Sequence, residues 1–369
     1  MNIESTVKER YSQGARETQE ALCCPVDYDS SLLAALPEEI IDKDYGCGDP
    51  SRYVQAGDVV LDLGSGGGKI CYMAAQLVGP QGRVIGVDMN DDMLALARKY
   101  QADMASKLGG DRVRFVKGYI QDLALDVDAL DRYLREHPVH DRESYAELRA
   151  WEARQRREQP LIADASVDLV ISNCVLNLVS DDEKEHLVRE IFRVLKPGGR
   201  IAVSDIVSDR PIPARLKQDA ELWSGCISGA FQDCEFLRTF ADNGFHAVCY
   251  DKWEAKPWRV MEGIEFRAVT LTACKGVTAG LHTDDQSLIY RGPFAAVIDD
   301  TGQRHVRGER SRVTSVQHAW LTDAAYQGAF IDPQTELPDI EASCCVPTLQ
   351  IIGSTQNDAS HTGHGGCCC

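Results

Sequence analysis

A short apolar segment that runs directly into a glycine-rich loop is the feature that most constrains how this chain can fold. Residues 58–63 (D-V-V-L-D-L) are followed by the loop G-S-G-G-G at 64–68, and a helical pattern continues over 69–78. Glycines let a backbone approach a ligand closely, and the free N–H groups at the start of a helix attract polar groups. We therefore expect a strand, a ligand-binding turn and a helix, in that order.

The same alternation of strand and helix continues along the chain. Strands are predicted at 83–88, 113–116, 167–172 and 200–206, and helices at about 93–107, 182–195 and 213–229, with a Lys-Pro-Gly-Gly turn at 196–199. Alternating strands and helices indicate an α/β fold with a doubly wound, mostly parallel sheet. Strands at about 245–253 and 266–273 are expected to close the sheet as its antiparallel edge.

A single core stops growing at about 250–300 residues, so we expect more than one folded unit in 369 residues. The changes in sequence pattern divide the chain into four parts. Residues 1–57 are predicted to form an N-terminal helix and a lid, and residues 58–275 the ligand-binding domain. A charged run at 126–160 is interpreted as a solvated helical insertion in that domain. Residues 276–335 are expected to form a small C-terminal α+β domain, and 336–369 a flexible Cys-rich tail.

The charge balance argues against nucleic acid or a membrane as the main ligand. Lys and Arg number 39 against 57 Asp and Glu, a net charge of −18, which repels phosphate backbones and anionic lipid. The N-terminus lacks the apolar core of a secretory signal, and no apolar run approaches the roughly 20 residues of a membrane span. We expect a small substrate and a cytoplasmic protein, in which the 14 cysteines are thiols, metal ligands or transient redox pairs.

The spacing of the glycines indicates the class of cofactor. A dinucleotide fingerprint G-x-G-x-x-G beginning at Gly64 needs glycine at position 69, where Lys69 stands, so nicotinamide binding is disfavoured. The pattern D-x-G-x-G-x-G resembles motif I of the class I S-adenosylmethionine-dependent methyltransferases. That resemblance implies S-adenosyl-L-methionine as the cofactor, Asp88 as the acceptor for the ribose hydroxyls, and a cofactor site made by Asp62, Gly64, Gly66, Gly68, Met89, Ile120 and Gln121, the last three flanking the adenine.

Three cysteines from distant segments are expected to converge at the mouth of the same site. Cys174 follows the fourth strand, Cys226 is placed on the helix after the fifth, and Cys47 belongs to the lid. Ligands in open α/β sheets lie beyond the carboxyl ends of the strands. Without histidines at metal spacing or C-x-x-C pairs, three thiols do not fit a zinc site and suit a soft, three-coordinate centre such as trivalent arsenic.

The segments around these cysteines resemble the arsenite methyltransferase family over residues 10–275. The matching motifs are Y-G-C-G at 45–48, N-C-V-L-N-L-V at 173–179 and W-x-x-C-x-x-G-A at 223–230. The resemblance implies that Cys47, Cys174 and Cys226 bind As(III), taken up as arsenite or an arsenic–glutathione conjugate, and that Tyr45 lies near the sulfonium. It further implies an enzyme that makes mono- and further methylated arsenicals for detoxification.

Methyl transfer formally oxidises arsenic, and a thiol pair can return it to the trivalent state. The expected donor is Cys47 with either Cys24 or Cys23, two adjacent cysteines where the family needs one, so the partner stays open. Thioredoxin or glutathione would reduce the resulting disulfide.

The other cysteines lie outside the expected three-cysteine site. We interpret four of them as buried filler: Cys71, Cys234, Cys249 and Cys274. The vicinal thiols at 344–345 and 367–369 either capture arsenic or have no role.

Two rival functions stay open. One rival function is methylation of an organic small molecule such as a quinone or a sterol. The other is a non-catalytic, thiol-rich metalloid binder.

Overall fold

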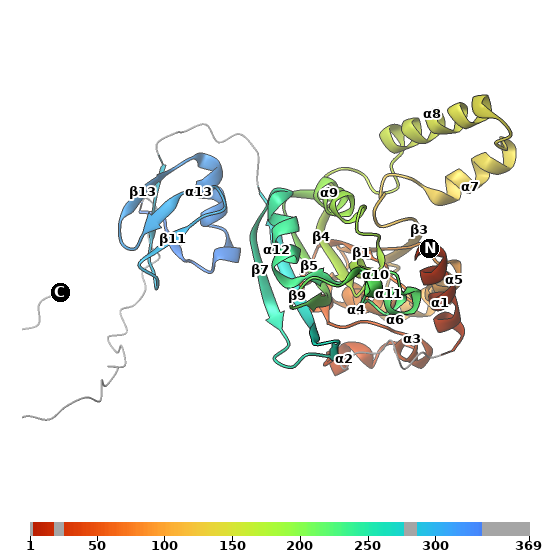
Figure 1. The fold of residues 1–369 in the computed structure, drawn as a ribbon, viewed down its shortest axis with the longest axis horizontal. Helices are drawn as coiled ribbons and strands as arrows, with labels where there is room; N and C mark the ends of the chain where they lie inside the picture. The colour runs from red at the N-terminus through yellow and green to blue at the C-terminus, as the bar shows by residue number, and fades with distance from the viewer. Residues whose placement is uncertain (1–2, 18–25, 277–285, 334–369) are drawn as a thin grey trace, which may run out of the picture. The chain divides into compact units, whose positions relative to one another are not determined.

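The structure of the chain is a computed structural model that describes residues 3–17, 26–276 and 286–333 (Figure 1). Cys23, Cys24 and the cysteines at 344–345 and 367–369 lie outside these described residues. None of the described helices is both long and apolar enough to cross a lipid bilayer.

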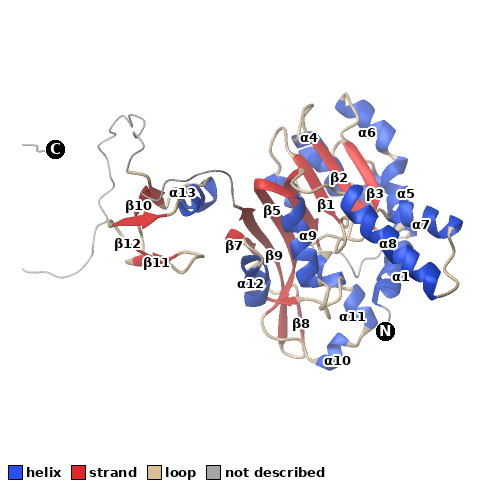
Figure 2. Cartoon of the chain, turned by 90° about the horizontal axis from the view of Figure 1, so that it is seen from above, coloured by secondary structure: helices blue, strands red, loops and turns tan. Residues whose placement is uncertain are grey.

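One sheet organises residues 59–275, in the strand order β3-β2-β1-β4-β5-β9-β7, with β6 paired to β5 and β8 to β9 (Figure 2). The first five strands in this order are parallel, whereas β9 and β7 are antiparallel. The expected fold class and its antiparallel edge are therefore confirmed. The strands are β1 (Val59–Leu63), β2 (Arg83–Asp88), β3 (Val113–Lys117), β4 (Val167–Asn173), β5 (Leu195–Ser208), β6 (Phe231–Gln232), β7 (Phe245–Trp253), β8 (Arg259–Met261) and β9 (Ile264–Lys275).

Helices cover both faces of the sheet, and the alternation along each strand supplies one core per face. In β4, Leu169 and Ile171 join the core under α4 (Lys69–Leu77), α5 (Asp91–Lys99) and α6 (Gln101–Leu108). Val170 points to the opposite core, under α9 (Lys184–Val194) and α12 (Asp233–Asp242). Strands buried on both faces explain why their sequences are almost continuously apolar.

Three predicted elements differ in detail from the structure. The helix expected at 93–107 is two helices, because the backbone leaves the α region at Tyr100 (φ −103°, ψ 3°). Strand β5 begins at Leu195, so the Lys-Pro-Gly-Gly turn is an irregularity within it. The helix expected at 213–229 is broken into α10 (Ala214–Lys217) and α11 (Ala220–Ser224), because Asp219 caps a new helix and Gly225 ends it. Cys226 therefore does not lie on a helix.

In the N-terminal part, helix α1 (Ile3–Arg16) packs near the carboxyl ends of the strands, whereas Leu36 and Ile40 belong to the core beside α4 and α6. Helix α1 lies against α5 and α11 (Figure 1). The predicted lid contains two short helices, α2 (Ser30–Leu33) and α3 (Glu38–Asp42), and a 3-10 helix, η2 (Pro50–Tyr53). Between α3 and η2, residues 43–48 run as an extended loop toward the end of β4.

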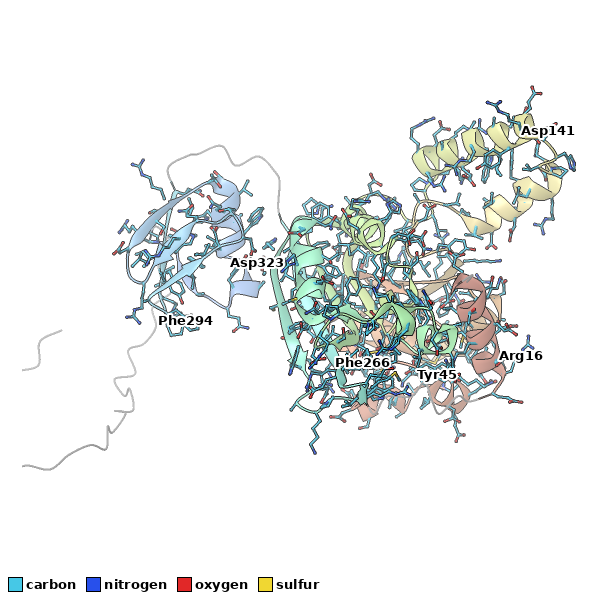
Figure 3. The ribbon with its side chains drawn as sticks, in the orientation of Figure 1. Arg16, Tyr45, Asp141, Phe266, Phe294 and Asp323 are labelled. Atoms are coloured by element: carbon cyan, nitrogen blue, oxygen red, sulfur yellow. A yellow bond between two sulfur atoms is a disulfide. The ribbon has the colours of Figure 1, made fainter. Side chains whose placement is uncertain are left out.

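The charged insertion forms a helical hairpin of α7 (Val127–Glu136) and α8 (Arg142–Glu158). Asp141, at the connection between them (Figure 3), begins α8 through a reciprocal capping box with Ser144. The two ends of the insertion are joined by backbone hydrogen bonds, from the N–H of Leu161 to Ala124 O at 3.1 Å and from the N–H of Ile162 to Leu123 O at 2.9 Å.

Residues 286–331 form small sheets of their own. The strands β10 (Gln286–Tyr290), β13 (Arg310–Val313) and β14 (Phe330–Ile331) make one sheet, and β11 (Ala296–Ile298) pairs with β12 (Arg304–Val306). Helix α13 (Ser315–Leu321) covers a core that includes Leu288, Val313 and Leu321.

We expect the helical hairpin to be dispensable for the fold. Replacing residues 128–159 by a short Gly-Ser turn removes exposed ion pairs such as Arg157–Glu158, which contribute about 0–1 kcal/mol each. The free energy of unfolding, measured in urea, should then change by less than about 2 kcal/mol. A loss of the cooperative unfolding transition would contradict this interpretation of the insertion.

Candidate active site

The glycine loop after β1 is held against β2 by its backbone. The N–H groups of Gly64 and Ser65 donate to Val87 O at 2.8 and 3.0 Å. Gly64 has a φ of +68°, and a Cβ atom there would lie 2.4 Å from the Val175 side chain. Only glycine fits this position, because both the dihedral angle and the close approach exclude a side chain.

Asp88 ends β2 with both carboxylate oxygens turned toward backbone donors. Its Oδ2 accepts from the N–H of Gly66, and its Oδ1 accepts from the N–H of Asn90, each at 2.8 Å. Burial raises the pKa of Asp88, and these hydrogen bonds oppose the rise. Because each ionised oxygen can accept more than one hydrogen bond, the carboxylate keeps the capacity to accept two ribose hydroxyls.

A cavity of about 500 Å³ opens beside this carboxylate. Such a volume is within the usual range for a small-molecule site. The predicted cofactor residues that line it are Tyr45, Asp62, Gly64, Gly66, Asp88, Met89, Ile120 and Gln121. Ser65 also lines it, and its buried Oγ has no hydrogen-bond partner among the described residues. The donors and acceptors in the cavity therefore suit a nucleoside.

Gly68 has a different place from the one expected. It does not line the cavity but caps α4 with a φ of +88°, where a Cβ atom would lie 2.8 Å from the Phe115 ring. The last glycine of the motif thus allows α4 to pack closely on the sheet. Its contribution to a cofactor site is indirect.

Asp62 lies at the floor of the cavity, in surroundings that disfavour its ionised form. Burial raises its pKa to about 7, the hydrogen bond from the Cys71 thiol opposes this rise, and the neighbouring Asp44 and Asp88 carboxylates add to it. The Cys71 Sγ donates to Asp62 Oδ2 at 3.2 Å. Cys71 is buried as predicted, and it also supplies a hydrogen bond to the cavity floor.

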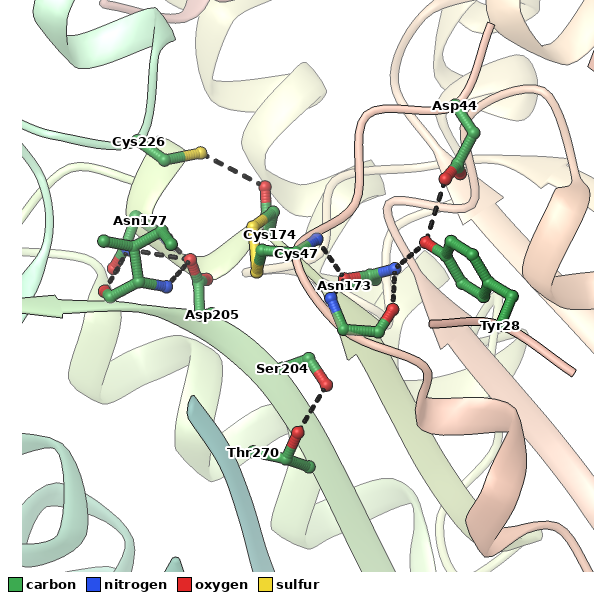
Figure 4. The surroundings of a disulfide bond; sticks show 12 residues. Tyr28, Asp44, Cys47, Asn173, Cys174, Asn177, Ser204, Asp205, Cys226 and Thr270 are labelled. Carbon is green, nitrogen blue, oxygen red and sulfur yellow. Dashed lines mark hydrogen bonds between the residues drawn. A yellow bond between two sulfur atoms is a disulfide. The ribbon is translucent and has the colours of Figure 1, made fainter. Parts of the chain in front are cut away.

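The structure brings Cys47, Cys174 and Cys226 into one buried cluster (Figure 4). Cys47 and Cys174 form a disulfide with a Cα–Cα distance of 5.8 Å, and the Cys226 thiol donates to Cys174 O at 3.4 Å. Each of the three is at most 6% exposed, and Cys174 also lines the nucleoside-sized cavity. Cys47 is thus paired with Cys174 in this structure, whereas the expected partners, Cys23 and Cys24, lie outside the described residues.

Two of these cysteines have a left-handed backbone. The φ angles of Cys174 and Cys226 are +60° and +59°. Residues with a Cβ rarely adopt this conformation, which costs about 1–3 kcal/mol per residue, and such strain clusters at functional sites. The backbone strain therefore indicates a functional role for Cys174 and Cys226, independently of the chemistry of their thiols.

Asn173 fixes the loop that carries Cys47. Its Oδ1 accepts from the N–H groups of Cys47 and Gly48 at 2.9 and 3.0 Å, and its Nδ2 donates to Gly48 O at 2.8 Å (Figure 4). The loop can approach this closely because Gly46 and Gly48 have no side chains: a Cβ atom at Gly46 would lie 2.0 Å from Asn173 Nδ2. The Y-G-C-G motif therefore has a packing reason for both of its glycines.

A partly buried ion pair extends this network to the helix after the glycine loop. Lys69 Nζ lies 3.0 Å from Asp44 Oδ2 and 3.5 Å from the centre of the Tyr28 ring. The Tyr28 hydroxyl donates to Asp44 Oδ2 at 3.0 Å and accepts from Asn173 Nδ2 at 3.3 Å. Lys69, which stands where the dinucleotide fingerprint needs glycine, thus links the glycine loop to the loop that carries Cys47.

Asp205 is a site residue that the sequence analysis missed. Ligand atoms of Asp205, Cys47 and Cys174 lie within 4.8 Å of one another. The carboxylate accepts from Asn177 Nδ2 at 2.7 Å and from the Ile206 N–H at 2.8 Å, while burial raises its pKa to about 7. The sequence could have indicated Asp205 through one feature, a single acidic residue within the apolar segment I-A-V-S-D-I-V of β5.

The interpretation of the other cysteines as buried filler is wrong for two of them. Cys234 and Cys249 are exposed, whereas Cys71 and Cys274 are buried. Cys249 belongs to β7, an edge strand with residues that alternate toward solvent, and Cys234 lies in the first turn of α12. Neither belongs to the three-cysteine cluster.

Comparisons with known proteins agree with this geometry. The family described as "Methyltransferase domain" matches residues 55–144 and 146–244, and a "Domain of unknown function (DUF8838)" matches 279–357. The arsenite methyltransferase of Aquipseudomonas alcaligenes is 34% identical over 63% of this chain and 58% of its own length. That of Homo sapiens is 33% identical over 54% of this chain and 44% of its own length. The chain thus matches about half the length of these relatives.

A solved structure resembles this chain over more of its length than the two relatives above. The crystal structure of an arsenic(III) S-adenosylmethionine methyltransferase from Chlamydomonas reinhardtii superposes with a TM-score of 0.55 at 27% identity. The alignment covers 84% of this chain and 96% of that one. The resemblance inferred from the motifs is therefore confirmed.

We expect Asp88→Asn to weaken S-adenosylmethionine binding about tenfold or more, because the amide replaces one acceptor oxygen by a donor. Titration calorimetry measures the affinity, and Asp103→Asn, at an exposed position of α6, is the matched control. Equal affinities of the two variants would show that Asp88 does not hold the nucleoside.

We expect Gly46→Ala to displace the cysteine loop, since its methyl group would overlap Asn173. After mild oxidation, peptide mass spectrometry should find much less of the Cys47–Cys174 disulfide than in the unaltered protein. Gly110→Ala is the control, because nothing lies within 4 Å of a Cβ atom there. An unchanged disulfide yield would mean that the loop reaches β4 without this glycine.

Proposed function

The chain belongs to the methyltransferase domain family, and from this premise we propose that it transfers a methyl group from S-adenosylmethionine to trivalent arsenic. The single observation that carries the proposal is the meeting of three buried cysteines at the edge of the nucleoside-sized cavity, with Cys174 belonging to both. The arsenite methyltransferases that match the chain support the same substrate.

The thiol cluster suits arsenic better than a hard cation. Three thiolates are soft ligands, and trivalent arsenic is thiophilic and takes three of them in a pyramid. Cys47, Cys174 and Cys226 would bind it after reduction of the Cys47–Cys174 disulfide, displacing hydroxide from arsenite or smaller thiols from an arsenic–glutathione conjugate.

The cavity residues would hold the cofactor by its nucleoside. Asp88 would accept the ribose hydroxyls, Met89, Ile120 and Gln121 would flank the adenine, and Asp62 and the Gly64–Gly66 turn would form the floor. The bound cofactor supplies an electrophilic methyl group on a sulfonium. The Tyr45 hydroxyl donates to Gly14 O at 2.9 Å, which fixes a ring whose face could stabilise a nearby cation by about 0.5–2 kcal/mol.

The chain's own contribution is mainly alignment. Its cysteines would hold the arsenic lone pair toward the cavity, and this nucleophile has no proton to lose, so no general base is needed. Holding two reactants in line can lower a barrier by up to about 7–11 kcal/mol. The burial of the three cysteines also keeps water from the reacting atoms.

The oxidised arsenic formed by methyl transfer would recover two electrons from a thiol pair, which becomes a disulfide. We keep Cys47 with Cys24 or Cys23 as the proposed donor, and the Cys47–Cys174 disulfide makes Cys174 a further candidate partner. Thioredoxin or glutathione would then reduce the disulfide. This requirement for free thiols supports action in a reducing compartment such as the cytoplasm, where the methylated arsenicals would be products of detoxification.

Arsenic speciation tests this function. The reduced protein, arsenite, a thiol and S-adenosylmethionine with a labelled methyl group are incubated, and mass spectrometry identifies the products. We expect labelled methylarsenicals from the unaltered protein and from Cys234→Ser, an exposed cysteine outside the cluster. Cys174→Ser should abolish them, because it removes one of the three ligands.

The rival functions predict other results. A methyltransferase for a quinone or a sterol would leave arsenite inorganic and keep its activity in Cys174→Ser. A metalloid binder would bind arsenite and leave it unmethylated. Inorganic arsenic alone after incubation would therefore rule out the proposed reaction.

A further inference from the structure

Gln121 lines the cofactor cavity at a point where three distant segments meet. It follows β3 and is 9% exposed. Its Nε2 donates to Glu4 Oε1 at 3.3 Å and to Glu183 Oε2 at 3.4 Å. Glu4 belongs to the first turn of α1, Glu183 directly precedes α9, and both also line the cavity. One amide therefore joins the N-terminal helix to the segment before α9.

The two carboxylates fix the orientation of this amide. An ionised carboxylate only accepts hydrogen bonds, whereas a glutamine amide has two N–H donors on its nitrogen and an acceptor on its oxygen. Glu4 and Glu183 use both donors of Gln121. Ser180 Oγ donates to Glu183 Oε2 at 2.9 Å and holds that carboxylate in place. An amide turned over would lose both hydrogen bonds and place its oxygen against two negative charges.

The two acidic groups are close enough to repel each other. Burial raises the pKa of Glu4, and the charge of Glu183 raises it further. The N–H donors of Gln121 lie between the two carboxylates and offset this repulsion. The arrangement therefore needs an amide nitrogen on this side of Gln121.

The amide oxygen is consequently left to the cavity. Within the described part of the chain, no residue donates to Gln121 Oε1, and this oxygen is not sealed inside the protein. The proposed function places Gln121 beside the base of the nucleoside. The amino group at position 6 of adenine can donate to this oxygen, whereas a carbonyl oxygen at position 6 of a purine would repel it.

We propose that Glu4 and Glu183 are positioning residues that make the cavity select a 6-aminopurine nucleoside over its 6-oxo counterpart. They act through Gln121, by holding its oxygen toward the base as an acceptor. The inference rests on the proposed contact between Gln121 and the base, and it does not depend on arsenic. A polar group left unpaired by the wrong ligand costs about tenfold or more in affinity.

The affinities of two nucleosides that differ only in the base test the proposal. They are S-adenosylhomocysteine, with a 6-amino group, and S-inosylhomocysteine, with a 6-oxo group, each titrated into the full chain by calorimetry. We expect the unaltered protein to bind the adenosyl ligand about tenfold more tightly or better. In Glu4→Ala/Glu183→Ala the amide can turn over and donate to the 6-oxo group. The inosyl ligand should then bind more tightly, and the ratio should fall to about threefold or less.

Two exposed glutamates outside the cavity provide the matched controls. Glu9→Ala on α1 and Glu185→Ala on α9 should both keep the ratio of the unaltered protein. Gln121→Met removes the donors and the acceptor together and should abolish the preference by itself. If the glutamates act through Gln121, adding Glu4→Ala and Glu183→Ala to Gln121→Met should leave the ratio unchanged.

Several outcomes would overturn the proposal. One is a tenfold preference that survives in Glu4→Ala/Glu183→Ala, and another is equal binding of the two ligands by the unaltered protein. An equal loss of both ligands in the double variant would give the glutamates a merely structural role and would also overturn it. Each single variant frees one N–H group and should show an intermediate ratio, so the test does not depend on the double variant folding.

Failure of the proposed function has a different signature. If the unaltered protein shows this preference and leaves arsenite inorganic, the proposed reaction is ruled out and the role of the two glutamates stands. If it methylates arsenic and binds the two nucleosides equally, only the role of the glutamates is lost.

Discussion

The amide of Asn173 is the interaction on which the rest of the site depends. It stands at the end of a central parallel strand and uses both its oxygen and its nitrogen to hold the loop of Cys47. The next residue along the strand is Cys174, so one short segment positions two of the three sulfur atoms. Because this partly buried amide loses several hydrogen bonds at once when the loop moves, the arrangement favours a single position of the loop.

Charge is distributed around the cavity in a way that matches its proposed ligands. Asp62 and Asp88 line it, and Asp205 lies by the sulfur atoms, so the buried carboxyl groups of Asp62 and Asp205 and the partly buried one of Asp88 lie around the place where a cationic sulfonium and a metalloid would meet. Burial raises the pKa of each of them. Their proximity to the positive charge of the sulfonium would favour the ionised forms.

The elements that carry strong local signals could be predicted from the sequence. The first strand, its glycine turn and Asp88 follow from chain pattern and spacing, and the parallel sheet follows from the alternation of elements. The segment around Cys226 could not be derived in this way: its apolar spacing looks helical, and only Asp219 and Gly225 break it. Asp205 was missed because β-strand patterning predicts apolar residues there, and the side chain that donates to it belongs to Asn177, 28 positions away. The role of Gly68 depends on the Phe115 ring, which lies far away in the sequence.

The left-handed backbone at Cys174 and Cys226 sets stability against activity. Glycine would adopt these dihedral angles without the steric cost of a Cβ atom. The backbone strain at the two positions is therefore a free-energy cost of placing a sulfur atom there, and it opposes the stabilisation that burial of each side chain gives.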